Sequence, residues 1–184
     1  MALLTPVVKA GFSDLGFESA VLAQQVLGGY GYVREWGVEQ LVRDARIAQI
    51  YEGTNGIQAL DLVGRKLALQ GGALPTRFFA LIRDTVHAAH AVPGGPEFGQ
   101  PLAEALARME RVTDSLRARI EDDASEGGAA SVDYLRLMLL LALGWMWTRM
   151  ALHTLQLDAD TGDHYLDKLH VARFFFLSSC ASIH

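Results

Sequence analysis

The sequence has little that would support an extracellular or nucleic-acid-binding protein. Cys180 is the only cysteine among 184 residues, so no internal disulfide can form, which fits a reducing cytoplasm. Acidic residues outnumber basic ones, with 21 Asp and Glu against 16 Lys and Arg and a formal net charge of −5. Nucleic-acid-binding domains are normally basic, so we expect no nucleic-acid partner. The N-terminus has no basic segment leading into an apolar core and a small-residue cleavage site, so we expect a cytoplasmic protein without a secretion signal.

The sequence also lacks an apolar run long enough to cross a membrane. The run from Leu137 to Trp147 has eleven residues, and it is bounded by Arg136 and by Thr148-Arg149. A bilayer core of ~30 Å needs ~20 predominantly apolar residues. We therefore expect no membrane span, and we expect this stretch to be a helix buried on most sides, in a bundle core or a subunit interface.

A complete set of metal ligands is missing as well. The Asp-rich turn at 158–163 has neither the central glycine nor the distal glutamate of a calcium loop. His87 and His90 lie on one predicted helix, but no cysteine or nearby acidic pair completes a zinc site. We expect no metal site, and we interpret both features as solvated surface.

No stretch shows the sustained period-two alternation of a half-buried strand, whereas apolar residues recur at helical spacing through most of the chain. The sequence therefore predicts an all-α fold, a helical bundle. The predicted helices cover about 5–13, 14–26, 38–50, 54–69, 75–91, 98–126, 131–157 and 163–177. Phe17, Val21, Leu22 and Val26 share one face of the second helix, and the aromatic cluster Trp145, Trp147 and Phe174 to Phe176 is predicted to be core.

Glycines and prolines interrupt this helical pattern. Gly28-Gly29 and Gly127-Gly128 are predicted to end helices, because glycine readily adopts a left-handed cap. Pro93-Gly94-Gly95-Pro96 predicts a turn. The break at 70–72 is interpreted as the boundary between two domains, 1–70 and 73–184.

The stretch of most chemical interest is Tyr51-Glu52-Gly53-Thr54, which separates two helical patterns. Gly53 can take a backbone conformation that other residues resist, and Thr54 or Asn55 can cap the following helix. A carboxylate at position 52 would then be fixed at a helix–helix corner, where it could act as a general base. Most such stretches are only a helix end followed by a cap, so the tetrapeptide alone leaves a purely structural role open.

The longer context resembles a known family. Three motifs follow one another in order: Gln25-Val26-Leu27-Gly28-Gly29-Tyr30-Gly31-Tyr32, then Arg43-Asp44-Ala45-Arg46-Ile47, then Ile50-Tyr51-Glu52-Gly53-Thr54-Asn55-Gly56-Ile57-Gln58. This run resembles the C-terminal segment of the acyl-CoA dehydrogenases, flavoenzymes that desaturate acyl-CoA thioesters. The similarity is dense over residues 5–67. Residues 73–184 resemble, more weakly, the helical extension of the subset that contains 3-methylmercaptopropionyl-CoA dehydrogenase.

The resemblance implies roles for individual residues. Glu52 matches the glutamate that takes the alpha proton of the substrate while the beta hydrogen leaves as hydride to the flavin. Gly53 matches a substrate-binding position whose backbone amide lies near the thioester carbonyl. Thr54 matches a residue that contacts the flavin nucleotide. Gln25, Gly28 and Gly29 match the segment that touches the ADP part of FAD bound by a neighbouring subunit. Arg43, Asp44 and Arg46 are expected to form an ion-pair network that supports the corner.

The resemblance also implies FAD as cofactor, an acyl-CoA substrate, an electron-accepting flavoprotein as partner and a homo-oligomer built through the C-terminal helices. Family members run to several hundred residues, with an N-terminal helical domain and a middle β-domain that form most of the flavin and acyl-CoA site. We therefore expect this chain to be a fragment or truncated form of such an enzyme, inactive alone. The alternative is a non-enzymatic helical oligomerisation or interaction module derived from the family.

Overall fold

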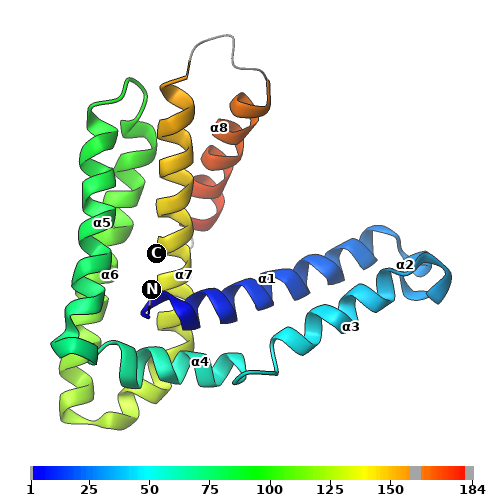
Figure 1. Ribbon diagram of the computed structural model, residues 1–184, viewed down its shortest axis with the longest axis horizontal. Coiled ribbons are helices and arrows are strands. Elements are labelled where there is room, and N and C mark those ends of the chain that lie inside the picture. Colours follow the sequence, from blue (N-terminus) through cyan, green and yellow to red (C-terminus); the bar gives the residue numbers. More distant parts are fainter. Residues whose placement is uncertain (1, 158–162, 181–184) are drawn as a thin grey trace.

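The structure is a computed structural model that describes residues 2–157 and 163–180. Every regular element in these two ranges is a helix or a helical turn, so the predicted all-α fold is confirmed. Figure 1 shows an upright bundle from whose base an arm of two helices projects sideways. The bundle contains α5 (Ala73–His90), α6 (Pro96–Asp122), α7 (Ala124–Leu155) and α8 (Asp163–Phe175). The arm contains α1 (Leu4–Val26) and α3 (Val38–Ala48), joined at the tip by α2 (Gly29–Tyr32) and the 3₁₀ turn Arg34–Trp36.

The arm and the bundle are connected along the base of the molecule. α4 (Asn55–Asp61) continues into a π-helical turn, Leu62–Lys66, and then into a 3₁₀ turn, Leu69–Gly72. The backbone is left-handed at Gln70, Gly71 and Gly72, with φ of 56°, 65° and 80°. This is the predicted break before α5. A further π-helical turn, Phe176–Cys180, follows α8.

One core runs from the base of the arm into the bundle. Its fully buried members come from both predicted domains and include Val7, Leu62, Ile82, Leu102 and Met138. The division at 70–72 stays a prediction, and the apolar packing is continuous across it. α7 is the central helix, since it packs against α1, α4, α5, α6 and α8. By length and composition alone α7 is also apolar enough to cross a membrane, a test that the core helix of a soluble protein passes as well.

α1 is a single helix, and the predicted boundary at Ser13-Asp14 is wrong. These residues read as helix-capping types, yet here their side chains face Asn55 of the corner. The side-chain amide of Asn55 donates to the Asp14 carboxylate at 2.6 Å and to the Ser13 hydroxyl at 2.9 Å. Because tertiary hydrogen bonds satisfy these polar groups, the helix continues through them.

The predicted end of a helix at Gly127-Gly128 is also wrong, because α6 and α7 meet at Asp123 instead. Asp123 is the N-cap of α7, and its carboxylate accepts a hydrogen bond from the Ser125 amide at 2.8 Å. That backbone hydrogen bond lowers the pKa of the Asp123 carboxyl group. Gly127 lies inside α7 facing neighbouring side chains, where a Cβ would sit 3.1 Å from Ile120 and 3.2 Å from Val63. The glycine therefore allows close packing and does not end the helix.

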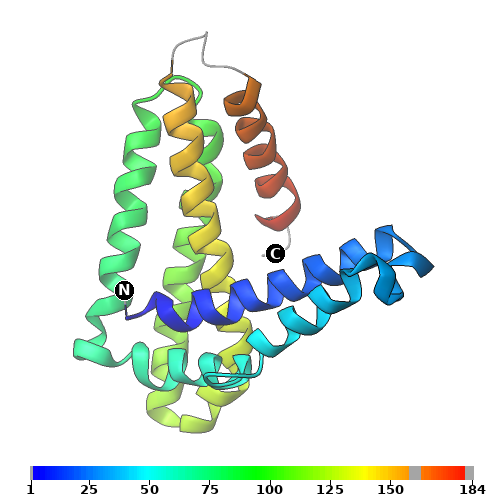
Figure 2. The same ribbon diagram turned by 45° about the vertical axis from the view of Figure 1, so that its right-hand side comes forward.

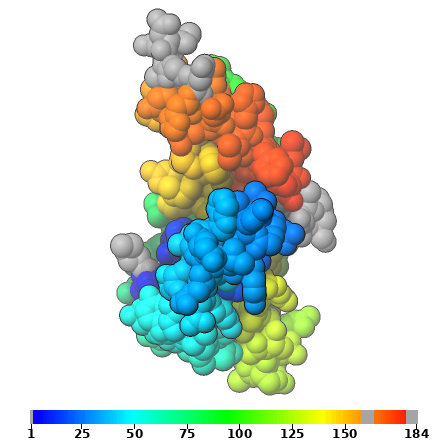
Figure 3. All heavy atoms as spheres, turned by 90° about the vertical axis from the view of Figure 1, so that its right-hand side faces the viewer, coloured from blue at the N-terminus to red at the C-terminus, as the bar shows by residue number. Residues whose placement is uncertain are grey.

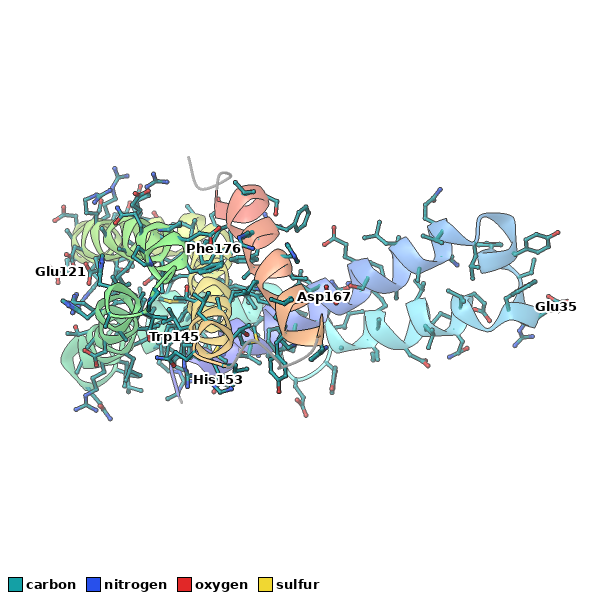
Figure 4. All side chains as sticks on the ribbon, turned by 90° about the horizontal axis from the view of Figure 1, so that it is seen from above. Glu35, Glu121, Trp145, His153, Asp167 and Phe176 are labelled. Atoms are coloured by element: carbon teal, nitrogen blue, oxygen red, sulfur yellow. The ribbon has the colours of Figure 1, made fainter. Side chains whose placement is uncertain are left out.

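α8 is held against the upper bundle by aromatic packing and one ion pair. Phe176 packs with Phe98, and the Arg173 guanidinium forms two hydrogen bonds with the Glu97 carboxylate at 2.6 and 2.9 Å. Trp145 and Phe176, labelled in Figure 4, both lie within the bundle, as the aromatic-cluster prediction required. Phe174 is the exception at 70% exposure, because it is on the face of α8 turned away from the bundle.

The arm leaves many apolar side chains uncovered. α1 and α3 lie side by side in Figures 1 and 2, and Figure 3 shows the tip standing out in front of the bundle. The apolar face that the sequence predicted on this part of α1 is therefore uncovered at Val21, Leu22 and Val26. Leu22 is 57% exposed and Val26 is 86% exposed. In the two-helix arm each helix has only one neighbouring helix, so part of the apolar face of each helix stays exposed to solvent.

A buried hydrogen bond links α6 and α7 at Thr113 and Tyr134. The two hydroxyl oxygens are 2.9 Å apart, and the Thr113 hydroxyl is also 2.7 Å from the Met109 carbonyl oxygen. Burial raises the pKa of Tyr134 to about 12 from an ordinary value of 10.0, and the hydrogen bond with Thr113 partly opposes this. The folded state therefore holds the phenol proton more tightly than the unfolded chain does.

This difference predicts a loss of stability in alkali. Because the folded pKa is the higher one, the contribution is complete below pH ~10 and disappears as the pH rises towards ~12. The free energy of unfolding should fall by up to ~3 kcal/mol over that interval. Tyr134→Phe should remove this dependence and cost ~1 kcal/mol at neutral pH through the lost hydrogen bond. Urea unfolding at a series of pH values measures both, with the exposed Tyr30→Phe variant as control. Equal alkaline losses in the parent and in Tyr134→Phe would contradict the prediction.

Candidate functional site

The predicted corner lies between α3 and α4, where the chain reverses through a left-handed segment. Glu52 and Gly53 have φ of 54° and 82°, and Thr54 is the N-cap of α4. The Thr54 hydroxyl oxygen accepts from the Ile57 amide at 3.4 Å, so the expected cap at Thr54 is confirmed. The backbone amide of Asn55 donates to the Gln49 carbonyl oxygen at 3.2 Å, and this bond closes the corner against the end of α3.

Glu52 has a backbone conformation that residues with a Cβ rarely adopt. A left-handed conformation costs ~1–2 kcal/mol for such a residue, and strained residues of this kind cluster at functional sites. The Glu52 side chain is exposed, and its carboxylate has no hydrogen-bond or ion-pair partner among the described residues. The neighbouring Tyr51 and Ile57 side chains are exposed too. Glu52 is therefore flanked by apolar side chains, but these are open to solvent.

This strain predicts that Glu52→Gly stabilises the chain. Glycine removes the left-handed cost, and its extra backbone entropy in the unfolded state offsets only part of the gain. We expect the free energy of unfolding to rise by ~1 kcal/mol, whereas Glu52→Ala retains the cost and should leave it nearly unchanged. Urea unfolding of the two variants measures the difference. A Glu52→Gly variant less stable than Glu52→Ala would show that the corner is not strained.

Side chains from α1 and α4 hold the backbone of the corner. The Lys9 ammonium donates to the Gly53 carbonyl oxygen at 2.7 Å and to the Asn55 side-chain oxygen at 2.9 Å. The Gln58 side-chain amide donates to the Glu52 carbonyl oxygen at 2.9 Å. Sequence reasoning did not single out Lys9 or Gln58. Gln58 lies within the third motif, whereas nothing near Lys9 in the sequence indicates a contact with Gly53.

The remaining predicted site residues lie at the other end of the arm. Gln25 is exposed in the last turn of α1, Gly28 has φ of 58°, and Gly29 begins α2. α3 has 11 residues, so this tip is ~16 Å or more from the corner. The structure therefore brings Glu52, Gly53 and Thr54 together and Gln25, Gly28 and Gly29 together, but it keeps the two groups apart. A Cβ at Gly31 would lie 2.4 Å from the Gln24 carbonyl oxygen, so the tip also depends on a glycine that was not predicted as a site residue.

A cleft with a volume of about 660 Å³ lies beside the tip. Its lining includes Gln24, Arg34, Glu39 and Arg43. The expected ion-pair network around Arg43 is wrong, since within the described residues Arg43, Asp44 and Arg46 form no ion pairs. Asp44 accepts from Gln40 at 2.7 Å, and Arg46 donates to Gln49 at 2.6 Å and lies 5.8 Å from the Phe17 ring centroid. Arg43 is left to line the cleft, where guanidinium groups suit an anionic ligand.

Among the described residues there is no group of three or more His, Cys, Asp or Glu side chains that could hold a metal ion. His87 and His90 are on the exposed surface of α5, as predicted. Most of the Asp-rich turn at 158–163 falls outside the residues that the structure describes.

Two family models match nearly the whole chain. Residues 3–67 match the acyl-CoA dehydrogenase C-terminal domain, and residues 78–182 match the domain described as acetyl-CoA dehydrogenase C-terminal like. The chain is 41% identical over 143 residues to 3-methylmercaptopropionyl-CoA dehydrogenase of Ruegeria pomeroyi, a match that covers 77% of this chain and 24% of the relative. It is 33% identical over 184 residues to the broad-specificity linear acyl-CoA dehydrogenase FadE5 of Mycobacterium tuberculosis, covering 94% of this chain and 30% of the relative.

A butyryl-CoA dehydrogenase of Syntrophomonas wolfei is 27% identical over 182 residues, which cover 94% of this chain and 29% of the relative. The chain thus spans less than a third of the length of these three relatives. The second family model alone covers more than half of the chain, and the first covers the corner and the arm. The chain belongs to the acyl-CoA dehydrogenase family and corresponds to its C-terminal segment.

Proposed function

We propose that this chain supplies the catalytic corner of a flavin-dependent acyl-CoA dehydrogenase, with Glu52 as the base that removes the alpha proton of an acyl-CoA thioester. The observation that carries the proposal is the exposed, unpartnered Glu52 carboxylate on a strained turn that side chains from two helices support. A strained backbone persists only where its surroundings over-determine it, and such sites are commonly functional. A carboxylate that makes no competing ion pair is free to accept a proton from a substrate.

The backbone of the corner also suits a thioester. Among the described residues, the amide N–H groups of Glu52 and Gly53 have no hydrogen-bond acceptor. An amide aimed at the thioester carbonyl stabilises the negative charge that grows on that oxygen as the alpha proton leaves. The proton passes to the Glu52 carboxylate, and the electron pair of the broken C–H bond moves towards the carbonyl. Gly53 has no side chain to obstruct this approach.

The remaining residues fit a flavin nucleotide. FAD, when bound, accepts the beta hydrogen of the substrate as hydride. The Thr54 hydroxyl oxygen already accepts from the Ile57 amide, which leaves its proton available for donation to a nucleotide. The tip that carries Gln25, Gly28 and Gly29 also has a cleft lined by two guanidinium groups, Arg34 and Arg43, which suit the phosphates of an ADP moiety. We propose an electron-accepting flavoprotein as the next partner, and we place α7 in a bundle core rather than a membrane.

We expect residues 1–184 alone to bind FAD and acyl-CoA weakly. The corner and the tip each offer one open face of a site, and the relatives are more than three times longer than the matched segment. Purification followed by flavin absorbance and by calorimetric titration with FAD tests this. A yellow sample with stoichiometric flavin would contradict the prediction and would assign the whole cofactor site to these residues.

The second candidate is a non-enzymatic oligomerisation module, and the uncovered apolar side chains of the arm favour it. The two candidates differ at Glu52. In an active flavoprotein that contains this chain, removing the Glu52 carboxylate abolishes desaturation. In an assembly module the property to measure is self-association, and removing the carboxylate leaves it unchanged. Assaying the same variant for both properties separates them.

A further inference from the structure

Two side chains that take no part in the proposed proton transfer hold consecutive carbonyl groups of the corner. Gln58 donates to the Glu52 carbonyl oxygen at 2.9 Å, and Lys9 donates to the Gly53 carbonyl oxygen at 2.7 Å. Lys9 is on α1, 44 residues away from Gly53, and Gln58 is on α4. The two donors therefore act from different helices on Glu52 and Gly53, the two residues of the corner that have left-handed backbone conformations.

Peptide planarity gives these contacts a directional consequence. In a trans peptide the C=O of one residue and the N–H of the next lie in one plane and point in opposite directions. A donor that fixes the Glu52 carbonyl therefore also fixes the direction of the Gly53 N–H, which points away from Gln58. That N–H has no acceptor among the described residues, so it is free to donate to a bound molecule. In the same way Lys9 fixes the peptide unit between Gly53 and Thr54.

The fit between Gln58 and Gly53 is close. A Cβ built on Gly53 would lie 3.1 Å from the Gln58 side-chain nitrogen and 3.4 Å from an Ile57 methyl group. A side chain at position 53 would thus displace the amide that holds the Glu52 carbonyl. The requirement for glycine here comes from this contact as well as from its φ of 82°.

Lys9 is itself braced. Its second acceptor is the Asn55 side-chain oxygen at 2.9 Å, and the Asn55 side-chain nitrogen donates to the Ala10 carbonyl oxygen at 3.2 Å and to the Asp14 carboxylate at 2.6 Å. Gln49 donates to the same Asp14 oxygen at 2.6 Å. The network ties the corner to one segment of α1, so a movement of α1 would be transmitted to the Gly53 peptide units.

We propose that Gln58 and Lys9 are positioning residues. Gln58 aims the Gly53 N–H at the thioester carbonyl, and Lys9 fixes the following peptide unit, so that together they keep Glu52 and Gly53 in their left-handed conformations. This rests on the proposed function, in which that amide polarises the carbonyl while Glu52 takes the proton. Neither residue touches the reacting atoms. A misplacement of ~1 Å in such a site lowers the rate by up to ~10²-fold, which sets the size of the expected effect.

The first test uses the 184-residue chain alone and needs no catalysis. Gln58→Met and Lys9→Met remove the donors at similar side-chain length, Lys9→Arg restores a cation, and Gln100→Met is the matched control because Gln100 donates only within α6. Nuclear magnetic resonance should show a changed Gly53 amide shift and a changed Glu52 HN–Hα coupling in both donor variants, with unchanged helix content. Lys9→Arg should return towards the parent and Gln100→Met should equal it. Parent-like Glu52 and Gly53 signals in Gln58→Met would overturn the proposal.

The second test uses the flavin-loaded enzyme that contains this chain. Gln58→Met should lower kcat ~10²-fold with little change in KM and flavin content, because the lost interaction matters mainly in the transition state. The carbonyl stretching frequency of a bound acyl-CoA analogue should rise, since the carbonyl is less polarised. A lower kcat with an unchanged carbonyl frequency would overturn the positioning role. If Glu52 is not the base, the Glu52→Gln variant keeps its activity, which is a separate result. The magnetic resonance test then still decides whether Gln58 and Lys9 determine the backbone conformation of Glu52 and Gly53.

Discussion

Glu52→Gln is expected to lower the rate of alpha-proton abstraction ~10⁴-fold in the flavin-loaded enzyme that contains this chain. Loss of a general base typically costs ~10²–10⁴-fold, and a sole base acting on a carbon acid belongs at the upper end. Glutamine has nearly the same shape but cannot accept the proton. Since the Glu52 carboxylate has no protein partner within the described residues, the change disrupts no ion pair. Rapid mixing with saturating acyl-CoA, followed at the flavin absorbance, measures the step directly.

The control for this experiment is Glu121→Gln, which lies on the side of the bundle opposite the arm (Figure 4). It makes the same chemical change on an exposed residue and should retain the parent rate. Flavin content and the free energy of unfolding should be the same in both variants, which separates a lost base from a damaged fold. A Glu52→Gln rate within a few-fold of the parent would show that the base lies elsewhere, and it would favour a purely structural role for the corner.

The corner was predictable because its signals are local. Helical periodicity stops before Tyr51 and resumes after Thr54, Gly53 marks the left-handed step, and Thr54 is a good cap. The strained conformation of Glu52 itself was not predictable, since nothing in the sequence distinguishes a left-handed glutamate from an ordinary one. The contacts of Lys9 and Gln58 that stabilise it come from helices whose relative placement the local pattern does not contain.

The errors have the same origin. Ser13 and Asp14 are capping residue types, and their role inside α1 depends on Asn55, which is 41 residues away from Asp14 in the sequence. In the sequence Gly127 is typical of a helix end, and only the three-dimensional structure shows that Ile120 and Val63 pack closely against it. For α1 the sequence shows only that one face is apolar, because periodicity does not show whether anything covers that face.

The uncovered face of the arm leads to the second prediction, that the chain is a homo-oligomer. Contiguous exposed apolar patches larger than a few hundred Å² are rare in monomers. Leu22, Val26 and Leu41 are all more than half exposed on the arm. The apolar stretch of α7, the other predicted interface, is instead largely engaged within the bundle, where Tyr134, Met138 and Leu141 are buried. We therefore propose that the arm alone provides the contact, most simply in a twofold dimer.

Light scattering coupled to size-exclusion chromatography at micromolar concentration should give about twice the chain mass of 20.1 kDa or more. Replacing Leu22, Val26 and Leu41 together by glutamate should shift the mass to that of the monomer, because each buried carboxylate would lack a partner in the contact. Leu81→Glu, on the exposed side of α5, is the matched control and should retain the parent mass. A parent chain that elutes as a 20.1 kDa monomer would contradict the prediction. The exposed arm would then be a surface for a different polypeptide, and the Glu52 corner at its base would be completed by that partner rather than by a second copy.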